Sequence, residues 1–457
     1  MTAQKDRIEG VLLTTAAGDA LGAPYEFQPP RGPELDVAMV GGGVWQPGEW
    51  TDDTAMAVAI AEVAATGADL RDEAAQDDIV SRWLQWSRDT KDIGIQTSSV
   101  LRTAAIGTTI TAKRARAMSE DLHRRTGRTA GNGSLMRTAP VALAYLDDAD
   151  AMVEAARAIS ELTHFDPDAG DACVLWCSAI RHSVLTGELD VRVGLRHLDS
   201  QRRELWSARL DVAERSRPVD FPNNGWVVAA LQAAWSAIVT TPVPTDDPAS
   251  GVFRADHLRL ALDSAVRAGF DTDTVAAIAG GLLGAVHGAS AVPLEWRTLL
   301  HGWPGGTARG LVKLAGAIAR GGRPERFDPS YRGYRIDALA RHPYDDGVLL
   351  GGVGALRDLP GDVDAVVSLC RIGDDDVPRG VPHVEVRLID RDGADENPHL
   401  DCCTASKPKA GHHRSRHCTG RAFEGWARMK QSTRYCGFFR VLGRTRLSER
   451  HWTALLR

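Results

Sequence analysis

Two pairs of acidic residues, far apart in the chain, carry the side chains best suited to bind a divalent cation. Asp52 and Asp53 stand between two threonines, and Asp271 and Asp273 alternate with two others. Carboxylate and hydroxyl oxygens suit hard cations such as magnesium or manganese, whereas zinc prefers imidazole and thiolate. If the two segments face each other, they can hold one or two ions, which bind a substrate oxygen and activate a water together.

Each acidic segment is followed by a run of small, apolar residues, which predicts that the carboxylates stand at the starts of two buried helices. Thr51 is a suitable N-cap for the first helix, and the helix dipole favours acids in the first turn. A purely structural interpretation therefore stays open, in which the acids only cap a helix. Burial argues against it, because adjacent carboxylates repel each other and lose hydration unless a cation lies between them.

Five segments, taken in order, resemble the ADP-ribosylglycohydrolase family, to which the ADP-ribosyl-dinitrogen reductase hydrolases belong. They are GVLLTTAAGDALGAPYEF, GEWTDDTAMA, AGNGSLMRTAPVAL, ELTHFDPDAGDA and GFDTDTVAAIAGG. The resemblance covers about residues 5–325 and depends on the order and spacing of all five segments. It implies an all-α fold with a centre of two magnesium ions, or manganese in their place. It also implies cleavage of the N- or O-glycosidic bond that joins ADP-ribose to an acceptor.

The resemblance also assigns roles to single positions of this chain. It implies metal ligands at Thr51, Asp52, Asp53, Asp271, Asp273 and Thr274, and catalytic residues at Glu26, Asp52 and Asp273. It implies that a loop wraps the substrate's diphosphate, with substrate contacts from Gly131, Asn132, Gly133, Ser134 and His164. Without the resemblance, the loop reads as an ordinary turn and His164 as a capping or packed residue. Asp19 is expected to be a buried structural or supporting residue.

Two functions from different classes follow from these residues. The leading hypothesis is a magnesium-dependent hydrolase that acts on an ADP-ribosylated protein side chain or a related small ADP-ribosyl compound. The alternative is a non-catalytic protein that binds ADP-ribose or a related nucleotide. The full set of ligand types together with Glu26 favours the enzyme, because a binding protein can lose ligands freely. The acceptor stays open between arginine, serine, a nucleic-acid end and a free small molecule.

Length and composition agree with this picture. The chain has 457 residues, enough for two or three domains with a substantial core. Its formal net charge of −6 gives no reason to expect nucleic acid as a partner. The sequence has no basic and apolar leader and no apolar run long enough to span a bilayer, and its seven cysteines are mostly isolated. We therefore expect a cytoplasmic protein without a membrane partner.

Residues 1–325 are expected to form one helical domain. Alanine-rich amphipathic windows recur along them, for example at residues 72–89 and 151–162, with polar connections between them. Trp226 and Trp235 accompany a strongly apolar window, so we expect both to lie in the core rather than to form a binding platform.

After a linker rich in Gly, Pro and Arg at residues 326–345, the pattern changes to short apolar strands of an α/β fold. Residues 346–401 resemble the first half of a dual-specificity phosphatase domain, and the resemblance places Asp390 in the loop of the general acid. Such a domain needs a cysteine nucleophile in a His-Cys-x5-Arg loop, and the His-Cys pair at residues 417–418 lacks the arginine at that distance. We therefore expect an incomplete, phosphatase-like region in which Asp390 is non-functional and phosphatase activity is missing.

Residues 402–457 are expected to be an irregular tail rather than a native domain. They are rich in Arg, Lys, Cys and His and show no sustained apolar period. A zinc site is disfavoured, because adjacent Cys-Cys and His-His pairs lack the usual ligand spacing. A shifted reading frame explains more: synonymous codons for residues 402–421 can encode LHCVQAQSRTPSVAALYGA, which contains the missing His-Cys-x5-Arg motif. The tail is therefore interpreted as frame-shifted phosphatase sequence.

Overall fold

The computed structural model describes residues 3–107, 109–247, 252–323, 339–342, 345–368, 377–378, 380–385 and 439–443. The chain divides into two units. The helical unit comprises residues 4–244 and 255–325, and the sheet unit includes residues 326–457.

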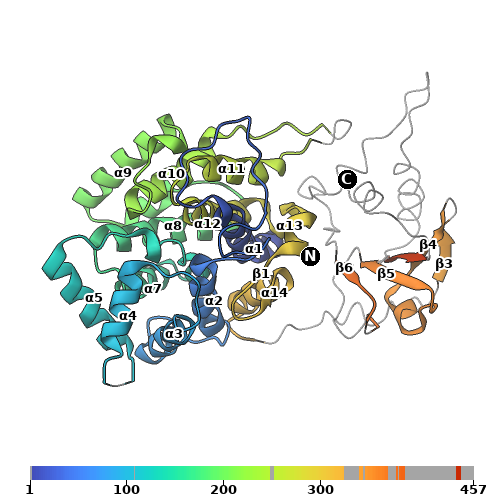
Figure 1. Ribbon diagram of the computed structural model, residues 1–457, viewed down its shortest axis with the longest axis horizontal. Coiled ribbons are helices and arrows are strands. Elements are labelled where there is room, and N and C mark those ends of the chain that lie inside the picture. Colours follow the sequence, from blue (N-terminus) through green and yellow to red (C-terminus); the bar gives the residue numbers. More distant parts are fainter. Residues whose placement is uncertain are drawn as a thin grey trace. The chain divides into compact units, whose positions relative to one another are not determined.

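The helical unit is built from α-helices, and a long connection, residues 26–51, leads into the second of them, as Figure 1 shows. Its helices are α1 (Ala3–Gly22), α2 (Asp52–Ala64), α3 (Glu73–Trp86), α4 (Ile95–Ala104), α5 (Ala112–Thr126), α6 (Ala139–Ala144), α7 (Ala149–Glu161), α8 (Pro167–Thr186), α9 (Ser200–Arg215), α10 (Val227–Thr240), α11 (Asp256–Arg267), α12 (Thr272–His287), α13 (Leu294–Leu299) and α14 (Ala308–Ala319). A short antiparallel pair, β1 (His301–Gly302) and β2 (Gly306–Thr307), precedes α14. The prediction of an all-α fold is therefore confirmed for this unit, and the windows at 72–89 and 151–162 form α3 and α7.

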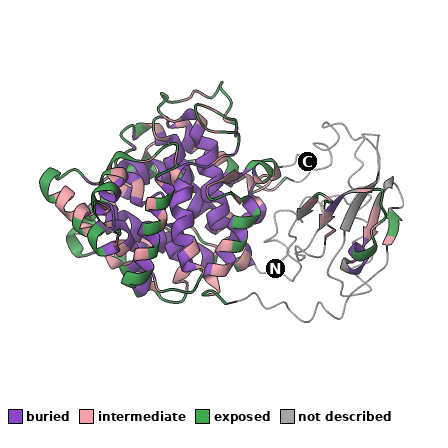
Figure 2. Ribbon diagram, turned by 60° about the horizontal axis from the view of Figure 1, so that its bottom comes forward, coloured by how far each residue is buried: buried purple, intermediate pink, exposed green. Residues whose placement is uncertain are grey.

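Helices that are apolar on almost every side form the centre of the helical unit. α8, α10 and α12 bury most of their residues, and Figure 2 shows this buried interior beneath more exposed outer helices. Small and apolar residues fill consecutive positions of these helices and leave no polar stripe for water. Trp235 of α10 is buried, as expected. Among the described helices, none combines the length and apolar character that a membrane span requires.

α1 and α12 touch backbone to backbone because glycines line their contact. Gly18 lies against the backbone of Ala276, and Gly22 lies against the backbone of Asp273. A Cβ atom at either glycine would overlap that backbone. The contact fixes where α12 starts beside α1 and so brings Asp19 toward Asp273.

Gly18→Ala is expected to destabilise the helical unit by about 1–3 kcal/mol, the usual cost of overpacking a well-packed core. Gly310, exposed in α14, is the matched control, because a Cβ there meets the Thr307 hydroxyl at an ordinary 3.8 Å. Gly310→Ala is expected to raise stability by about 0.5–1 kcal/mol, because alanine favours the helix. Urea unfolding measures both changes. Two stabilising substitutions would show that α1 and α12 can separate without cost.

The sheet unit contains, within the described residues, a five-stranded sheet with the strand order β3-β4-β7-β5-β6. Its strands are β3 (Leu339–His342), β4 (Asp345–Gly351), β5 (Val363–Ser368), β6 (His383–Glu385) and β7 (Phe439–Gly443). β5 and β6 are parallel, and the other neighbouring strands are antiparallel. Leu356 and Val366 form a small buried cluster on this sheet.

The sheet agrees only in part with the sequence-based expectations. β4, β5 and β6 coincide with three expected strands, but β3 lies inside the segment expected to be a linker, 326–345. β7 lies in the expected irregular tail and pairs with both β4 and β5, so that expectation is wrong at residues 439–443. A phosphatase domain is not supported. Asp390 and the rest of the tail lie outside the described residues.

Candidate metal centre and active site

The first acidic pair stands at the N-terminus of α2, as the sequence predicts. Thr51 is the N-cap, and its hydroxyl accepts a hydrogen bond from the Asp53 amide (3.4 Å). Asp19, buried on α1, accepts hydrogen bonds from the amides of Thr51 and Thr54, each at 2.9 Å. A neighbouring helix thus satisfies donors that the start of α2 leaves without an intrahelical partner. These bonds hold the start of α2 against α1 with Asp53 buried.

The second acidic segment begins α12. The Asp271 amide donates to Asn224 Oδ1 (3.1 Å), and the Asp271 carboxylate accepts a hydrogen bond from Asn132 Nδ2 (2.7 Å). Asp273, in the first turn, accepts a hydrogen bond from the Thr274 amide (2.9 Å). These partners are neutral, so they orient the two carboxylates without balancing their charge.

A hydroxyl group joins the two helix ends. Thr274 Oγ1 on α12 donates to Asp53 Oδ1 on α2 at 3.0 Å. Around this contact, carboxylate oxygens of Asp19, Asp53 and Asp273 all lie within 4.8 Å of one another. The same holds for oxygens of Glu26, Asp271 and Asp273. The two oxygen clusters therefore meet at Asp273.

Asp52 does not join these clusters. It belongs to neither group, it is half-buried, and its Oδ2 accepts a hydrogen bond from the Gly94 amide at 3.4 Å. Consecutive residues of an α-helix point about 100° apart, so the two adjacent aspartates meet different neighbours. Asp53 joins a cluster, whereas Asp52 is in neither cluster but lies close enough to Asp271 for that charge to raise its pKa. The metal-binding and catalytic roles of Asp52 therefore stay predictions that these distances do not support.

Burial raises the pKa values of the carboxyl groups in both clusters. The pKa values of Asp53 and Asp273 lie well above the ordinary value, because both groups are buried and because neighbouring carboxylates repel their charge. The same causes raise the pKa of Asp52 to about 7 and that of Glu26 to about 8. None of the ion pairs within the described residues involves these four side chains. The site therefore concentrates negative charge that a bound cation would balance.

The donors in this site fit a hard divalent cation. Both clusters offer carboxylate oxygens, with the Thr274 hydroxyl beside them, and neither contains a histidine or cysteine. Magnesium and manganese prefer such ligands. Asp53, Asp271 and Asp273 are placed to hold one or two ions. Thr51 Oγ1 lies 3.3 Å from Asp53 Oδ2 and stays a predicted ligand.

The predicted diphosphate loop packs directly on His164. A 3₁₀ turn, Asn132–Ser134, forms most of the loop. A Cβ atom at Gly131 would lie 3.2 Å from His164 Nε2, and one at Gly133 would lie 3.1 Å from it. Glycine allows the backbone to approach the imidazole this closely. The structure thus brings Gly131, Gly133 and His164 together.

Two side chains of the loop are turned toward the protein. Asn132 Nδ2 donates to Asp271 Oδ2 (2.7 Å) and to the Asn224 carbonyl (2.9 Å). Ser134 is buried, with its hydroxyl 3.6 Å from Cys173 Sγ. Both side chains position the loop, and the Asn132 amide donates to the Gly225 carbonyl (3.1 Å), so the substrate-binding role of Asn132 and Ser134 stays a prediction.

Sequence reasoning does not identify three residues that belong to this site. Asn224 holds Asp271, and the Asn-Gly pair before a helix is the signal that could have found it. Asp92 raises the pKa values of Glu26 and Asp52, but no motif marks it. Trp226 is 38% exposed and pairs through its backbone with Gly131, which corrects its expected place in the core.

The backbone beside two of the acids adopts an unusual conformation. Phe27 and Phe270 both have φ of 61°, in the left-handed region that favours glycine. The Phe27 amide donates to the Phe270 carbonyl (2.6 Å), and the Phe270 amide donates to the Gln28 carbonyl (2.7 Å). Such strained residues cost about 1–3 kcal/mol each and persist where the surrounding structure enforces them. The paired segments hold Glu26 and Asp271, which directly adjoin the two phenylalanines.

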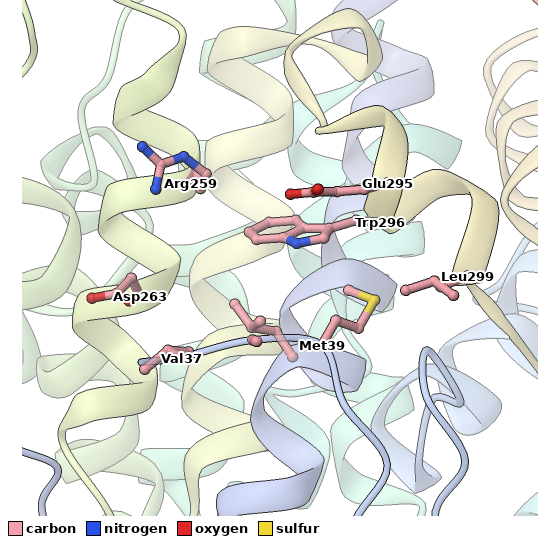
Figure 3. Close-up of a pocket in the computed structure, with 9 residues that line it drawn as sticks. Val37, Met39, Arg259, Asp263, Glu295, Trp296 and Leu299 are labelled. Carbon is pink, nitrogen blue, oxygen red and sulfur yellow. The ribbon is translucent and has the colours of Figure 1, made fainter. Parts of the chain in front are cut away.

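A cavity of about 300 Å³ lies elsewhere, between α1, α11 and α13. Figure 3 shows Trp296 in this cavity, with Arg259 and Asp263 across from Leu299. None of the residues that line it belongs to the oxygen clusters or to the diphosphate loop. The cavity is therefore not part of the candidate site.

Comparisons with known proteins identify the family. The sequence model of the family described as ADP-ribosylglycohydrolase matches residues 1–326. ADP-ribosylarginine hydrolase Tri1 of Pseudomonas putida (strain GB-1) is 30% identical over 304 residues, which cover 64% of this chain and 73% of that protein. ADP-ribosyl-[dinitrogen reductase] glycohydrolase of Rhodospirillum rubrum is 29% identical over 307 residues, which cover 65% of this chain and 90% of that protein.

The solved structures include a similar fold. A chain named "ADP-ribosylglycohydrolase-related protein complex" matches with a TM-score of 0.52 and 28% identity, covering 71% of this chain and 100% of the other. Together with the matched family and its glycohydrolase relatives, this fold shows that the chain belongs to the ADP-ribosylglycohydrolase family and is a glycohydrolase.

Proposed function

We propose that this protein hydrolyses the glycosidic bond between ADP-ribose and an arginine side chain, using one or two magnesium ions held between the starts of α2 and α12. The observation that carries the proposal is that a buried oxygen cluster and a half-buried one share Asp273, and that Asp273 forms no ion pair with the described residues. The relatives support the substrate, because two of them are named for ADP-ribosylarginine and for ADP-ribosyl-dinitrogen reductase. Manganese is the alternative ion.

Each acid has a task in this proposal. Asp53, Asp271 and Asp273 would hold the ion, and a bound ion would supply orientation of the ribose hydroxyls and polarisation of a water. Glu26 offers a carboxylate oxygen within 4.8 Å of oxygens of Asp271 and Asp273, so it is placed to exchange a proton with a water held there. A carboxylate oxygen of Glu26 takes a proton from the water while the water oxygen attacks the ribose C1′ atom. The bond from C1′ to the guanidine nitrogen breaks, and that nitrogen receives the proton, so Glu26 is regenerated.

The charge around Glu26 favours a cationic acceptor. Asp52 and Asp92 contribute negative charge near this residue, and Asp92 is exposed. A guanidinium is attracted to such carboxylates, whereas a neutral serine side chain is not. An anionic nucleic-acid end would be repelled. These charges support arginine over the other acceptors.

The direct test is release of free ADP-ribose from ADP-ribosylarginine on a protein, with and without magnesium, beside the same assay on ADP-ribosylserine. We expect turnover only with the ion, and faster turnover of the arginine-linked substrate. Tight binding of ADP-ribose without any turnover would favour the alternative, a non-catalytic binding protein.

Glu26→Gln is expected to lower kcat by about 10²–10⁴-fold, the usual contribution of a general base. The Kd for ADP-ribose should change little, because glutamine keeps the shape of the side chain. Glu295→Gln, in the separate cavity of Figure 3, is the matched control and should keep full kcat. A Glu26→Gln variant with normal kcat would show that another group takes the proton.

A further inference from the structure

Beneath the diphosphate loop, a buried arginine is connected to His164 through a single hydroxyl group. Arg137, Thr163 and His164 are all at least nine-tenths buried. Arg137 Nη2 donates to Thr163 Oγ1 at 2.7 Å, and Thr163 Oγ1 lies 2.7 Å from His164 Nδ1. The three side chains form a chain of hydrogen bonds that ends on the imidazole ring.

Arg137 is held in place on several sides. Its guanidinium carbon lies 4.0 Å from the centre of the Trp83 ring, and its Nη1 contacts Met56 Sδ at 3.6 Å. Burial lowers the pKa of Arg137 to about 9, so the side chain is a cation at neutral pH. Its Nε has no hydrogen-bond partner among the described residues. A buried cation with an unsatisfied donor is costly, so packing alone does not explain this residue.

The direction of these hydrogen bonds follows from what each group can donate. A guanidinium only donates, so Thr163 Oγ1 accepts the bond from Arg137. In the described part of the chain, the one acceptor that pairs with the hydroxyl hydrogen of Thr163 is His164 Nδ1. If Nδ1 carried a hydrogen instead, the hydroxyl hydrogen would be buried without an acceptor, which is unfavourable. His164 Nδ1 is therefore the acceptor.

The neutral ring then carries its hydrogen on the other nitrogen. Burial, followed by the charge of Arg137, holds the pKa of His164 well below its ordinary value. With Nδ1 accepting, a neutral imidazole has its hydrogen on Nε2. Nε2 forms no hydrogen bond with the described residues and lies against the backbone of Gly131 and Gly133.

We propose that Arg137, acting through Thr163, is a positioning residue that keeps His164 in the Nε2–H tautomer, so that the ring donates a hydrogen bond to the diphosphate of the substrate. This inference rests on the proposed function, because it takes the loop at Gly131 and Gly133 to be the diphosphate site. A phosphate oxygen is an acceptor, so a bare nitrogen lone pair in the same place would repel it.

The test compares Thr163→Val with Thr163→Ser in the full-length protein. Valine keeps the branched shape of threonine but lacks the hydroxyl, whereas serine keeps the hydroxyl. Thr163→Val is expected to weaken ADP-ribose binding about tenfold, a typical loss for one hydrogen bond to a charged group. Thr163→Ser is expected to bind like the wild type. Calorimetry with magnesium present measures both affinities.

The tautomer itself is read by NMR of protein labelled with ¹⁵N-histidine, and His164→Gln identifies the signal. We expect the hydrogen on Nε2 in the wild type and in Thr163→Ser, and a loss of that preference in Thr163→Val. Arg137→Met, which keeps a long apolar side chain, should change the tautomer in the same way. Thermal unfolding reports whether Arg137→Met folds. If it does not fold, the comparison of Thr163→Val with Thr163→Ser tests the proposal instead.

Three results would overturn the proposal: a hydrogen on Nδ1 in the wild type, equal loss of binding in the valine and serine variants, or no loss in the valine variant. Hydrolysis is assayed separately on wild-type protein. Binding of ADP-ribose with the expected tautomer but without hydrolysis would refute the proposed function and leave this role of Arg137 standing.

Discussion

Asp53→Asn and Asp273→Asn are each expected to lower turnover at least about 100-fold, because even supporting groups around a metal typically contribute 10–100-fold. Both variants should also be more stable than the wild type when no metal is present. Both carboxyl groups are buried among other acids, which hold their pKa values well above the ordinary value. A neutral amide removes that repulsion, but it is a weaker ligand for a hard cation.

Two measurements check this prediction: kcat at saturating magnesium, and thermal unfolding in the presence of a chelator. Asp121→Asn is the matched control, because Asp121 forms an exposed ion pair with Arg125 (2.8 Å) on α5. Such pairs contribute only about 0–1 kcal/mol, so the control should change neither quantity much. Normal kcat in Asp53→Asn and Asp273→Asn would rule out these residues as ligands. Unchanged unfolding temperatures in chelator would show that the acids do not destabilise the metal-free fold.

The helical architecture and the two acidic helix starts could be predicted from the sequence, because both depend on local patterns. Thr51 followed by acids and a small, apolar run is a helix start on propensity alone. Which aspartate joins an oxygen cluster could not be predicted, because it depends on the rotation of α2. Asp19, from a different helix, holds the start of α2 with Asp53 buried. The choice between Asp52 and Asp53 is thus a tertiary property.

The supporting residues show the same limit. Asn132 looks like part of a ligand loop, and only the fold reveals that its side chain holds Asp271. Trp226 looks like a core residue in an apolar window, but it directly precedes α10 and pairs with Gly131 in the loop. The glycines that let α1 touch α12 carry no chemistry of their own, so no motif search selects Gly18 or Gly22.

The sheet unit shows what a local pattern leaves out. The apolar runs at β4, β5 and β6 predict strands, because short runs bounded by turn residues need no tertiary information. The position of β7 between β4 and β5 is a pairing across many residues, which strand patterns do not determine. The interpretation of residues 402–457 as frame-shifted sequence stays a prediction.

Removal of the metal is expected to abolish turnover. It should also make the folded state less stable as the pH rises, whereas stabilisation by a bound ion should grow as the pH rises. Chelation should stop hydrolysis, and magnesium or manganese should restore it, whereas zinc should be a poor substitute for an all-oxygen site. The pKa is raised to about 6 at Asp19, about 7 at Asp52 and about 8 at Glu26. In each case burial is the largest cause and nearby charge or hydrogen bonding modifies it.

The sign of the pH effect follows from these shifts. A carboxyl group whose pKa is higher in the folded state binds its proton more tightly there, so it favours folding fully below its unfolded pKa near 4. That contribution is lost as the pH rises through the folded values, from about 6 at Asp19 to about 8 at Glu26. The metal-free protein should therefore lose stability between about pH 4 and pH 8.

With magnesium, protons compete less for the ligands as the pH rises, so stabilisation by the ion should grow over the same range. Thermal unfolding from pH 5 to pH 8, with chelator and with magnesium, measures the difference. A gap between the two curves that does not widen with pH, or full activity in excess chelator, would show that these carboxylates do not form a metal centre.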